Sequence, residues 1–290
     1  MMKSLRRCQA LFLFMALGLA SYGQSDTTIY AHRGFRGLMP GNTIPAMIYA
    51  LQHGAGVLEL DIAFTADKQA VLSHDPWLDH LITVDAKGQP IAAGKGLPIY
   101  KMSYAQVRTY DVGSKQHPDF PKQQNFPAHI PRLVDMIDSV EKYVALHKLP
   151  KPWYSIETKT SKNRDFVAQP EPEEFVRLLM AIIHEKNISD RVIIQSFDER
   201  TLEIVHRDFP TVITMVNINK GTLEENLARF TFQPDFYAPS PELIDEALLN
   251  KLRQLGMRII GGNTNDSKQI QRIKALGVHS YCTDYPPHKL

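Results

Sequence analysis

The chain is poor in cysteine: Cys8 and Cys282 are the only two in 290 residues. Cys8 lies in an N-terminal segment that we expect to be cleaved, so Cys282 would remain alone in the mature chain. A lone thiol forms no intramolecular disulfide, and it excludes a structural zinc site built on thiolates. Stability must therefore come from a packed core, which a chain of this length can bury.

The expected mature chain also lacks a surplus of charge. Removal of residues 1–23 takes away Lys3, Arg6 and Arg7, and the formal charge changes from +2 to −1. A near-neutral protein has no basic surplus for nucleic acid or for an anionic membrane surface. We therefore expect a small-molecule substrate, no nucleic acid and no stable membrane insertion, while the sequence leaves the oligomeric state open.

Residues 1–23 have the pattern of a secretory signal peptide. Their basic residues precede an unbroken apolar stretch from Ala10 to Ala20, and Ser21-Tyr22-Gly23 follows as a cleavage region. The apolar stretch is too short for a comfortable membrane span. This pattern predicts a secreted or periplasmic domain over residues 24–290. The alternative is an uncleaved N-terminal anchor.

Short β-rich runs alternate with helical patterns along the rest of the chain. The expected strands are Thr28–Ala31, Val57–Ile62, Tyr154–Glu157, Val192–Gln195, Val212–Val216, Asp235–Tyr237, Arg258–Ile260 and Val278–Cys282. The expected helices are Ile44–Gln52, Leu133–His147, Glu173–Lys186, Glu199–Arg207, Glu242–Leu255 and Ser267–Leu276. Eight strands that alternate with helices in one domain of this length predict a (β/α)8 TIM barrel. A doubly wound open sheet is the alternative.

Two segments interrupt the alternation. Gln69–Ser73 is an extra short strand after the second unit, and a long segment rich in turn residues follows it over residues 77–130. A segment of that length inside a compact barrel is usually functional. We therefore predict an inserted subdomain that caps a site.

Acidic residues lie at the ends of two expected strands. Glu59 and Asp61 are two positions apart, so their side chains share one face of a strand, and Glu157 ends the next strand. Anions that share a confined space repel unless a proton or a cation lies between them. Oxygen ligands favour Ca²⁺, Mg²⁺ or Mn²⁺ over zinc. These three residues are candidate ligands of one divalent metal ion; a solvated polar strand face is the alternative.

Histidines and fixed cations follow the same strands. His32 and His74 each come directly after a strand and could divide the roles of general base and general acid, or could be hydrogen-bonded packing histidines. Arg33 and Lys159 could contact a phosphate, or could pair with the carboxylates. In a barrel, the carboxyl ends of the strands meet at one mouth. The whole set indicates metal-assisted attack on a phosphodiester.

Six segments, in this order, resemble the glycerophosphodiester phosphodiesterase family. They are AHRGFRGLMPGNT, LELDIAFTADKQAVLSHD, IPRLVDMI, SIETK, IIQSF and GVHSYCTDYP, and they span almost all of the mature chain. The resemblance implies a TIM barrel that cleaves a glycerophosphodiester to sn-glycerol 3-phosphate and an alcohol. It also implies metal ligands at Glu59, Asp61 and Glu157, a catalytic histidine pair at His32 and His74, and phosphate contacts from Arg33 and Lys159. Asn42 and Gln195 are candidate supporting residues; Asn42 could instead cap the first helix.

The sequence departs from the family pattern at two positions. Gly41 stands where the family usually has glutamate, and Gly262 stands where a tryptophan is usual. The first change removes an anion near the mouth, and the second removes an aromatic wall that could face choline. The preferred alcohol is therefore open.

Two alternative functions are compatible with the same residues. One is a lysophospholipase D or sphingomyelinase D type of phosphodiesterase, which would need an apolar ledge for acyl chains. The other is a barrel without catalytic activity that binds phosphorylated ligands.

Overall fold

The computed structural model describes residues 27–94, 96 and 98–290. The expected signal peptide, residues 1–23, lies outside these residues. Over the described part of the chain, no helix combines the length and the apolar character that a bilayer span requires.

The described residues form a barrel of parallel strands, as the sequence predicts. The strands are β1 (Ile29–Ala31), β2 (Val57–Phe64), β4 (Trp153–Thr158), β5 (Val192–Ser196), β6 (Ile213–Ile218), β7 (Phe236–Pro239), β8 (Arg258–Ile259) and β9 (Tyr281–Thr283). They pair in the order β8-β7-β6-β5-β4-β2-β1-β9. A parallel bridge between Gly261 and Tyr281 joins the residues after β8 to β9, so the curled sheet closes on itself. The open-sheet alternative is wrong.

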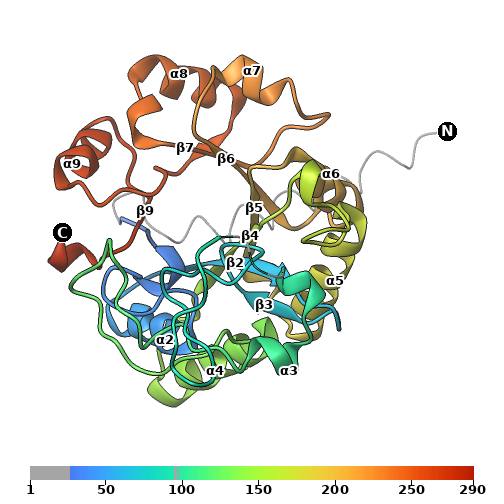
Figure 1. Cartoon of the computed structure of the whole chain (residues 1–290). Helices are drawn as coiled ribbons and strands as arrows, with labels where there is room; N and C mark the ends of the chain where they lie inside the picture. Colours follow the sequence, from blue (N-terminus) through green and yellow to red (C-terminus); the bar gives the residue numbers. More distant parts are fainter. Residues whose placement is uncertain (1–26, 95, 97) are drawn as a thin grey trace.

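Helices surround these strands (Figure 1). They are α2 (Ile44–Gln52), α4 (Leu133–His147), α5 (Pro172–Glu185), α6 (Glu199–Asp208), α7 (Leu223–Leu227), α8 (Glu246–Leu255) and α9 (Ser267–Ala275). Short 3-10 turns are η1 (His32–Gly34), η2 (Ile99–Lys101), η3 (Lys162–Arg164), η4 (Ser189–Arg191), η5 (Pro241–Leu243) and η6 (Pro287–Lys289). The expected helix from Glu242 is wrong at its start: η5 comes first, and Asp245 caps α8 by accepting from the Leu248 amide.

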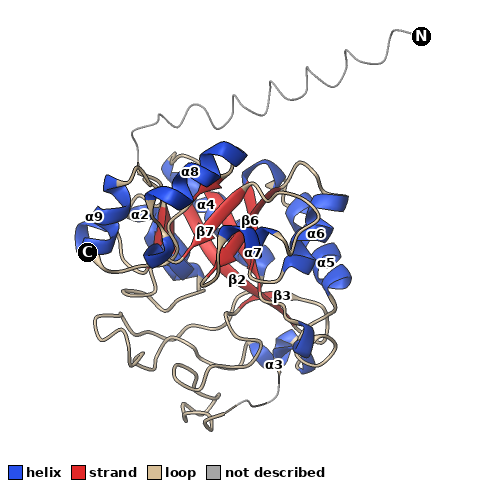
Figure 2. Ribbon diagram, turned by 90° about the horizontal axis from the view of Figure 1, so that it is seen from above, coloured by secondary structure: helices blue, strands red, loops and turns tan. Residues whose placement is uncertain are grey.

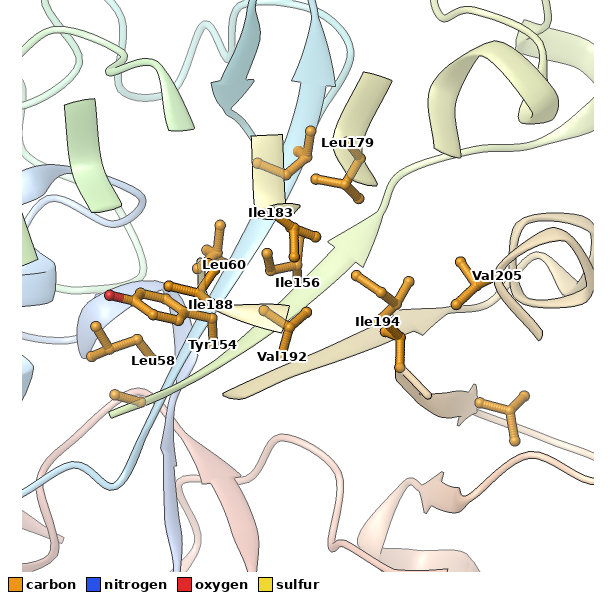
Figure 3. Packing of buried hydrophobic residues seen from close by; sticks show 14 of the residues in the cluster. Leu58, Leu60, Tyr154, Ile156, Leu179, Ile183, Ile188, Val192, Ile194 and Val205 are labelled. Atoms are coloured by element: carbon orange, nitrogen blue, oxygen red, sulfur yellow. The ribbon is translucent and has the colours of Figure 1, made fainter. Parts of the chain in front are cut away.

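The main core lies between the strands and the helices. Leu58 and Leu60 of β2 are fully buried together with Ile156 of β4. In Figure 3, Leu60 and Ile156 lie near Ile183 of α5, and Leu58 lies beside Tyr154. Because successive strand residues alternate between faces, the residues between these leucines point into the barrel. The apolar face of β2 thus fixes where its acidic residues lie.

The segment between the parallel strands β2 and β4 interrupts the alternation of strands and helices. It begins with β3 (Ala70–Leu72), which pairs antiparallel with β2, and later contains α3 (Tyr104–Val107). Figure 2 shows the loops around α3 gathered at one end of the barrel. Several apolar residues of this segment pack in a cluster that includes Ala63 of β2 and Val71 of β3. The segment thus packs on the barrel through a shared core, and an independent inserted subdomain stays a prediction.

Gly34 permits the tight turn that follows β1. Its φ is +79°, and an added Cβ would lie 2.6 Å from the backbone carbon of Ala46. Gly54 has the same φ of +79°, but an added Cβ there has open space. Both conformations are strained for other residues, at a cost of about 1–3 kcal/mol.

We expect Gly34→Ala to lower the free energy of unfolding by more than Gly54→Ala, because only the former adds a clash with backbone. Urea denaturation of both variants measures the difference. Equal losses would show that the contact with Ala46 relaxes without cost.

Candidate active site

Three carboxylates meet inside the barrel. Asp61 on β2 stands in register with Glu157 on β4, and Glu59 lies two residues earlier on the inward face of β2. One oxygen from each residue lies within 4.8 Å of the others, and all three side chains are buried. A solvated polar strand face, the alternative reading of Glu59 and Asp61, is therefore wrong. We call these three residues the carboxylate triad.

The triad is electrostatically crowded. Burial, Asp61 and Glu157 raise the pKa of Glu59 well above its usual value. Burial and Asp61 also raise the pKa of Glu157, against the opposing effect of Lys159. Burial alone would raise the pKa of Asp61, yet Arg33 and Lys159 hold it far below its usual range. One carboxylate thus stays ionised while its neighbours are pushed towards protonation, the condition that a bound cation relieves.

The triad has the chemistry of a divalent metal site. The Asp61 Oδ1 is buried and accepts no hydrogen bond in the described part of the chain. The Lys159 Nζ lies 3.8 Å from it, beyond hydrogen-bonding distance. Asp61 Oδ1 is thus a buried acceptor left open beside two further carboxylates. A set of oxygen donors alone fits Ca²⁺, Mg²⁺ or Mn²⁺.

Arg33 and Lys159 flank the triad. The Arg33 Nε lies 3.0 Å from Asp61 Oδ2, at an angle that makes the contact an ion pair rather than a hydrogen bond. The Arg33 backbone amide donates to Glu59 at 2.9 Å. Arg33 adopts a φ of 51°, a strained value that aims the residue at the triad. The Lys159 Nζ donates to Glu157 at 2.8 Å. Both cations thus pair with the carboxylates, one of the two roles considered for them.

Asn42 and Gln195 hold the triad in place. Asn42 Nδ2 donates to Asp61 Oδ2 at 2.9 Å, and Gln195 Nε2 donates to Glu59 Oε1 at 2.8 Å. The N-cap of α2 is Thr43, which accepts from the Ala46 amide, so Asn42 is not the helix cap. The sequence predicts both residues as supporting the site, and the structure puts both against a carboxylate.

The His32 ring contacts the carboxylate of Asp284, which follows β9. The His32 Nδ1 lies 2.5 Å from Asp284 Oδ1, and Arg36 and Asn265 donate to the same carboxylate at 2.8 and 2.7 Å. Burial and Arg33 lower the pKa of His32 to about 4, although Asp284 opposes this. The imidazole is therefore neutral at neutral pH. It donates from Nδ1 to Asp284 and leaves Nε2 as an acceptor.

Asp284, Arg36 and Asn265 received no role from the sequence, because their partners are distant along the chain. The signals were present, since Arg36 lies within the first resemblance segment and Asp284 follows the last strand. These residues come together only because β9 pairs with β1 in the folded barrel.

His74 lies nearer to the surface, after β3. Its side chain is 38% exposed, and its Nδ1 lies 3.4 Å from Asp75 Oδ1. The same histidine lines two adjoining cavities together with Arg33 and Arg36.

We call the larger cavity, of about 330 Å³, the mouth cavity; it is lined by Glu59, Glu157, Lys159 and His32 among others. We call the smaller one, of about 240 Å³, the side cavity; it extends beneath the segment that follows β3. The structure thus brings both histidines, both cations and two of the three carboxylates to one cavity. Their catalytic and binding roles stay predictions.

At both glycines that depart from the family pattern, an added side chain would lie too close to neighbouring atoms. At Gly41 an added Cβ would lie 2.8 Å from the Cβ of Arg36, and at Gly262 it would lie 2.7 Å from the Pro239 carbonyl oxygen. Gly41 lines the side cavity and Gly262 lines the mouth cavity. A larger side chain at either position would have to displace its neighbours.

The fold and the site define a (β/α)8 barrel with a buried carboxylate cluster, able to hold a metal ion, at the carboxyl ends of its strands. The model of the glycerophosphoryl diester phosphodiesterase family matches residues 32–288, and the chain belongs to this family. By that membership it is a phosphodiesterase that hydrolyses glycerophosphodiesters.

Known proteins agree with this placement. The chain is 26% identical over 265 residues to a glycerophosphodiester phosphodiesterase of Bacillus altitudinis, covering 90% of this chain and 95% of that one. A solved protein of Silicibacter pomeroyi assigned to the glycerophosphoryl diester phosphodiesterases superposes with a TM-score of 0.80 at 25% identity, covering 91% of each chain. An Oleispira antarctica phosphodiesterase, solved with the product sn-glycerol-3-phosphate, shares the fold with a TM-score of 0.70 at 20% identity and covers 89% of this chain and 93% of that one.

Proposed function

We propose that this protein hydrolyses glycerophosphodiesters to sn-glycerol 3-phosphate and an alcohol, with one divalent ion at the carboxylate triad. The observation that carries the proposal is the open, buried Asp61 Oδ1 between two further carboxylates and two cations. A bound divalent ion would polarise the phosphoryl oxygens and neutralise charge that develops on them. The Oleispira phosphodiesterase solved with sn-glycerol-3-phosphate supports this choice of product.

The two cations would hold the phosphate. In the structure Arg33 pairs with Asp61, and Lys159 pairs with Glu157. A divalent ion on the carboxylates would satisfy those anions, so the cations could turn part of their hydrogen-bonding capacity to a phosphate. The planar guanidinium suits two-point contact, and the ammonium adds a point charge.

We assign His32 as the general base and His74 as the general acid. The neutral His32 has Nε2 free to accept a proton from the attacking oxygen. Attack by water gives sn-glycerol 3-phosphate directly, whereas attack by the glycerol 2-hydroxyl gives a cyclic phosphate that water must then open to the same product. The more exposed His74, beside the Asp75 carboxylate, gives a proton to the alcohol oxygen as its bond to phosphorus breaks. The negatively charged Asp284 stabilises the imidazolium that forms on His32.

We also propose that the domain acts outside the cytoplasm, after cleavage of residues 1–23. The pattern of basic, apolar and cleavage regions in the sequence supports this. Edman sequencing of the protein exported by a bacterial host should show an N-terminus close to residue 24. An intact N-terminus on the exported protein would contradict cleavage.

Two assays test the reaction: release of glycerol 3-phosphate from glycerophosphodiesters, and release of the head-group alcohol from lysophospholipids. We expect turnover of glycerophosphodiesters and none of lysophospholipids, because both described cavities carry charged groups on their walls, which an acyl chain would desolvate. Activity on lysophospholipids alone would favour a lysophospholipase D. Ligand binding without turnover of any diester would favour a silent phosphate-binding barrel.

A further inference from the structure

The side cavity has features that the proposed reaction does not use. It adjoins the mouth cavity at Arg33, Arg36 and His74, but none of the three triad carboxylates lines it. A glycerol hydroxyl oriented by a metal on the triad must lie in the mouth cavity. The other arm of a diester, which leaves as the alcohol, would then pass His74 into the side cavity.

The side cavity is lined by both cations and carboxylates. Arg33 and Arg36 lie where the two cavities meet, which is the phosphate end of a bound diester. The Arg36 Nε is committed to Asp284, and its guanidinium lies 4.9 Å from the centre of the Phe120 ring. The wall also carries three carboxylates that line the side cavity and not the mouth cavity: Asp75, which lies beside His74, Asp79 and Asp119. The pattern is complementary to a ligand with a phosphate at one end and a positive charge at the other.

Two of these carboxylates have capacity to bind such a ligand. Neither Asp79 nor Asp119 forms an ion pair with any residue that the structure describes. Asp79 Oδ1 accepts from the Leu81 amide at 2.9 Å, whereas no described donor bonds Oδ2. Burial and Arg36 lower the pKa of the nearby His117, so that side chain adds no positive charge at neutral pH.

A second observation points to a hydrogen-bonding ligand. Thr83 is fully buried and lines the side cavity, yet its Oγ1 has no hydrogen-bond partner within the described chain. An unpaired buried hydroxyl is unfavourable unless something else satisfies it. Thr83 Oγ1 is closed to solvent, so an N–H donor in the cavity would satisfy it after the Thr83 side chain rotates towards the cavity, whereas a ligand of purely hydrocarbon character would not satisfy it.

The walls distinguish two kinds of cationic head group. Quaternary ammonium groups are bound by the faces of aromatic rings. No Phe, Tyr or Trp is among the residues that line the side cavity in the described structure. A primary ammonium instead needs oxygen acceptors, which Asp79 and Thr83 provide. Apolar side chains such as Leu72, Val112 and Ile130 suit the short carbon chain between ammonium and phosphate.

We infer that the side cavity binds the leaving alcohol of the substrate and selects one that carries a primary ammonium, as in glycerophosphoethanolamine. Asp79 and Thr83 are the residues that determine this specificity. The inference rests on the proposed function, because it assumes that the diester's glycerol arm lies over the triad.

Head-group selectivity tests the inference. kcat/KM is measured with saturating divalent ion for glycerophosphodiesters with ethanolamine, choline or glycerol head groups. We expect the wild type to favour the ethanolamine diester over the glycerol diester by about tenfold, the worth of one charged hydrogen bond. Asp79→Asn should lower the ratio of kcat/KM for the ethanolamine diester to kcat/KM for the glycerol diester by about tenfold. Asp85→Asn is the matched control, because Asp85 lies in the same segment but does not line the cavity, and it should leave the ratio unchanged.

Thr83→Val separates hydrogen bonding from charge. It should lower the ratio of ethanolamine to choline hydrolysis by about threefold to tenfold, because the choline nitrogen has no N–H to donate. Thermal unfolding of each variant checks that it is folded.

A wild type that cleaves all three diesters equally would overturn the inference and leave the proposed function intact. An Asp79→Asn variant with unchanged selectivity, or with equal losses on all three, would also overturn it. A wild type that cleaves none of the three would instead overturn the proposed function.

Discussion

Treatment with EDTA is expected to abolish hydrolysis, and added Mg²⁺, Ca²⁺ or Mn²⁺ to restore it. Without a cation, Glu59 and Glu157 face the ionised Asp61 in a buried space, and Asp61 Oδ1 has no partner. Loss of the ion removes several kcal/mol of stabilisation from the charge that develops on the phosphate, so the rate should fall by about a thousandfold or more. The measurement is release of glycerol 3-phosphate at each metal concentration. Full activity in excess chelator would disprove the metal site.

Substitution and pH sharpen this expectation. Glu157→Gln removes one ligand charge and should raise the metal concentration needed for half-maximal activity, whereas Glu185→Gln, at an exposed position on α5, should not. The pKa values of Glu59 and Glu157 are raised in the metal-free protein, so protons compete with the metal. The half-saturating metal concentration should therefore fall as pH rises. A value independent of pH would place the metal elsewhere.

His32→Ala is expected to lower kcat by about 10²–10⁴, the usual contribution of a general base. His129→Ala is the control, because His129 is exposed and lies outside both cavities. A base must be unprotonated to act, and the pKa of His32 is lowered to about 4. With saturating metal, wild-type activity should stay level as pH falls past 6.5 and decline only near pH 4.

The Asp284→Asn variant separates positioning from proton transfer. Asp284 raises the pKa of His32 through its hydrogen bond and its charge. Its neutralisation should therefore lower kcat while moving the acid limb of the pH profile to still lower pH. An acid limb that moves upward, or an unchanged kcat, would show that His32 is not the base that Asp284 holds.

The sequence was sufficient where function follows from neighbours along the chain. Glu59 and Asp61 are two apart on a strand whose intervening leucine must be buried, so their common face was determined by alternation alone. The same alternation of strands and helices predicted the barrel. In each case a local pattern carries the information.

The sequence did not predict contacts between residues that are far apart along the chain. Gln195 meets Glu59 across 136 residues, and Asp284 meets His32 across 252. The start of α8 was missed because two helix-start signals compete, and the Asp245 side chain caps the helix while Ser240 begins only a short turn. Helix α7 spans only five residues, too few for a periodic apolar face to reveal it.

The contact between His32 and Asp284 also constrains when activity can begin. The proposed general base, His32, directly follows the first strand of the barrel, and the carboxylate that contacts it, Asp284, directly follows the last strand. A nascent polypeptide from which residue 284 has not yet emerged lacks the contact between His32 and Asp284. The onset of turnover during synthesis or export therefore reports that the two ends of the domain have met. Deletion of residues 284–290 would remove Asp284, and with it the contact to His32, although it would delete no strand residue.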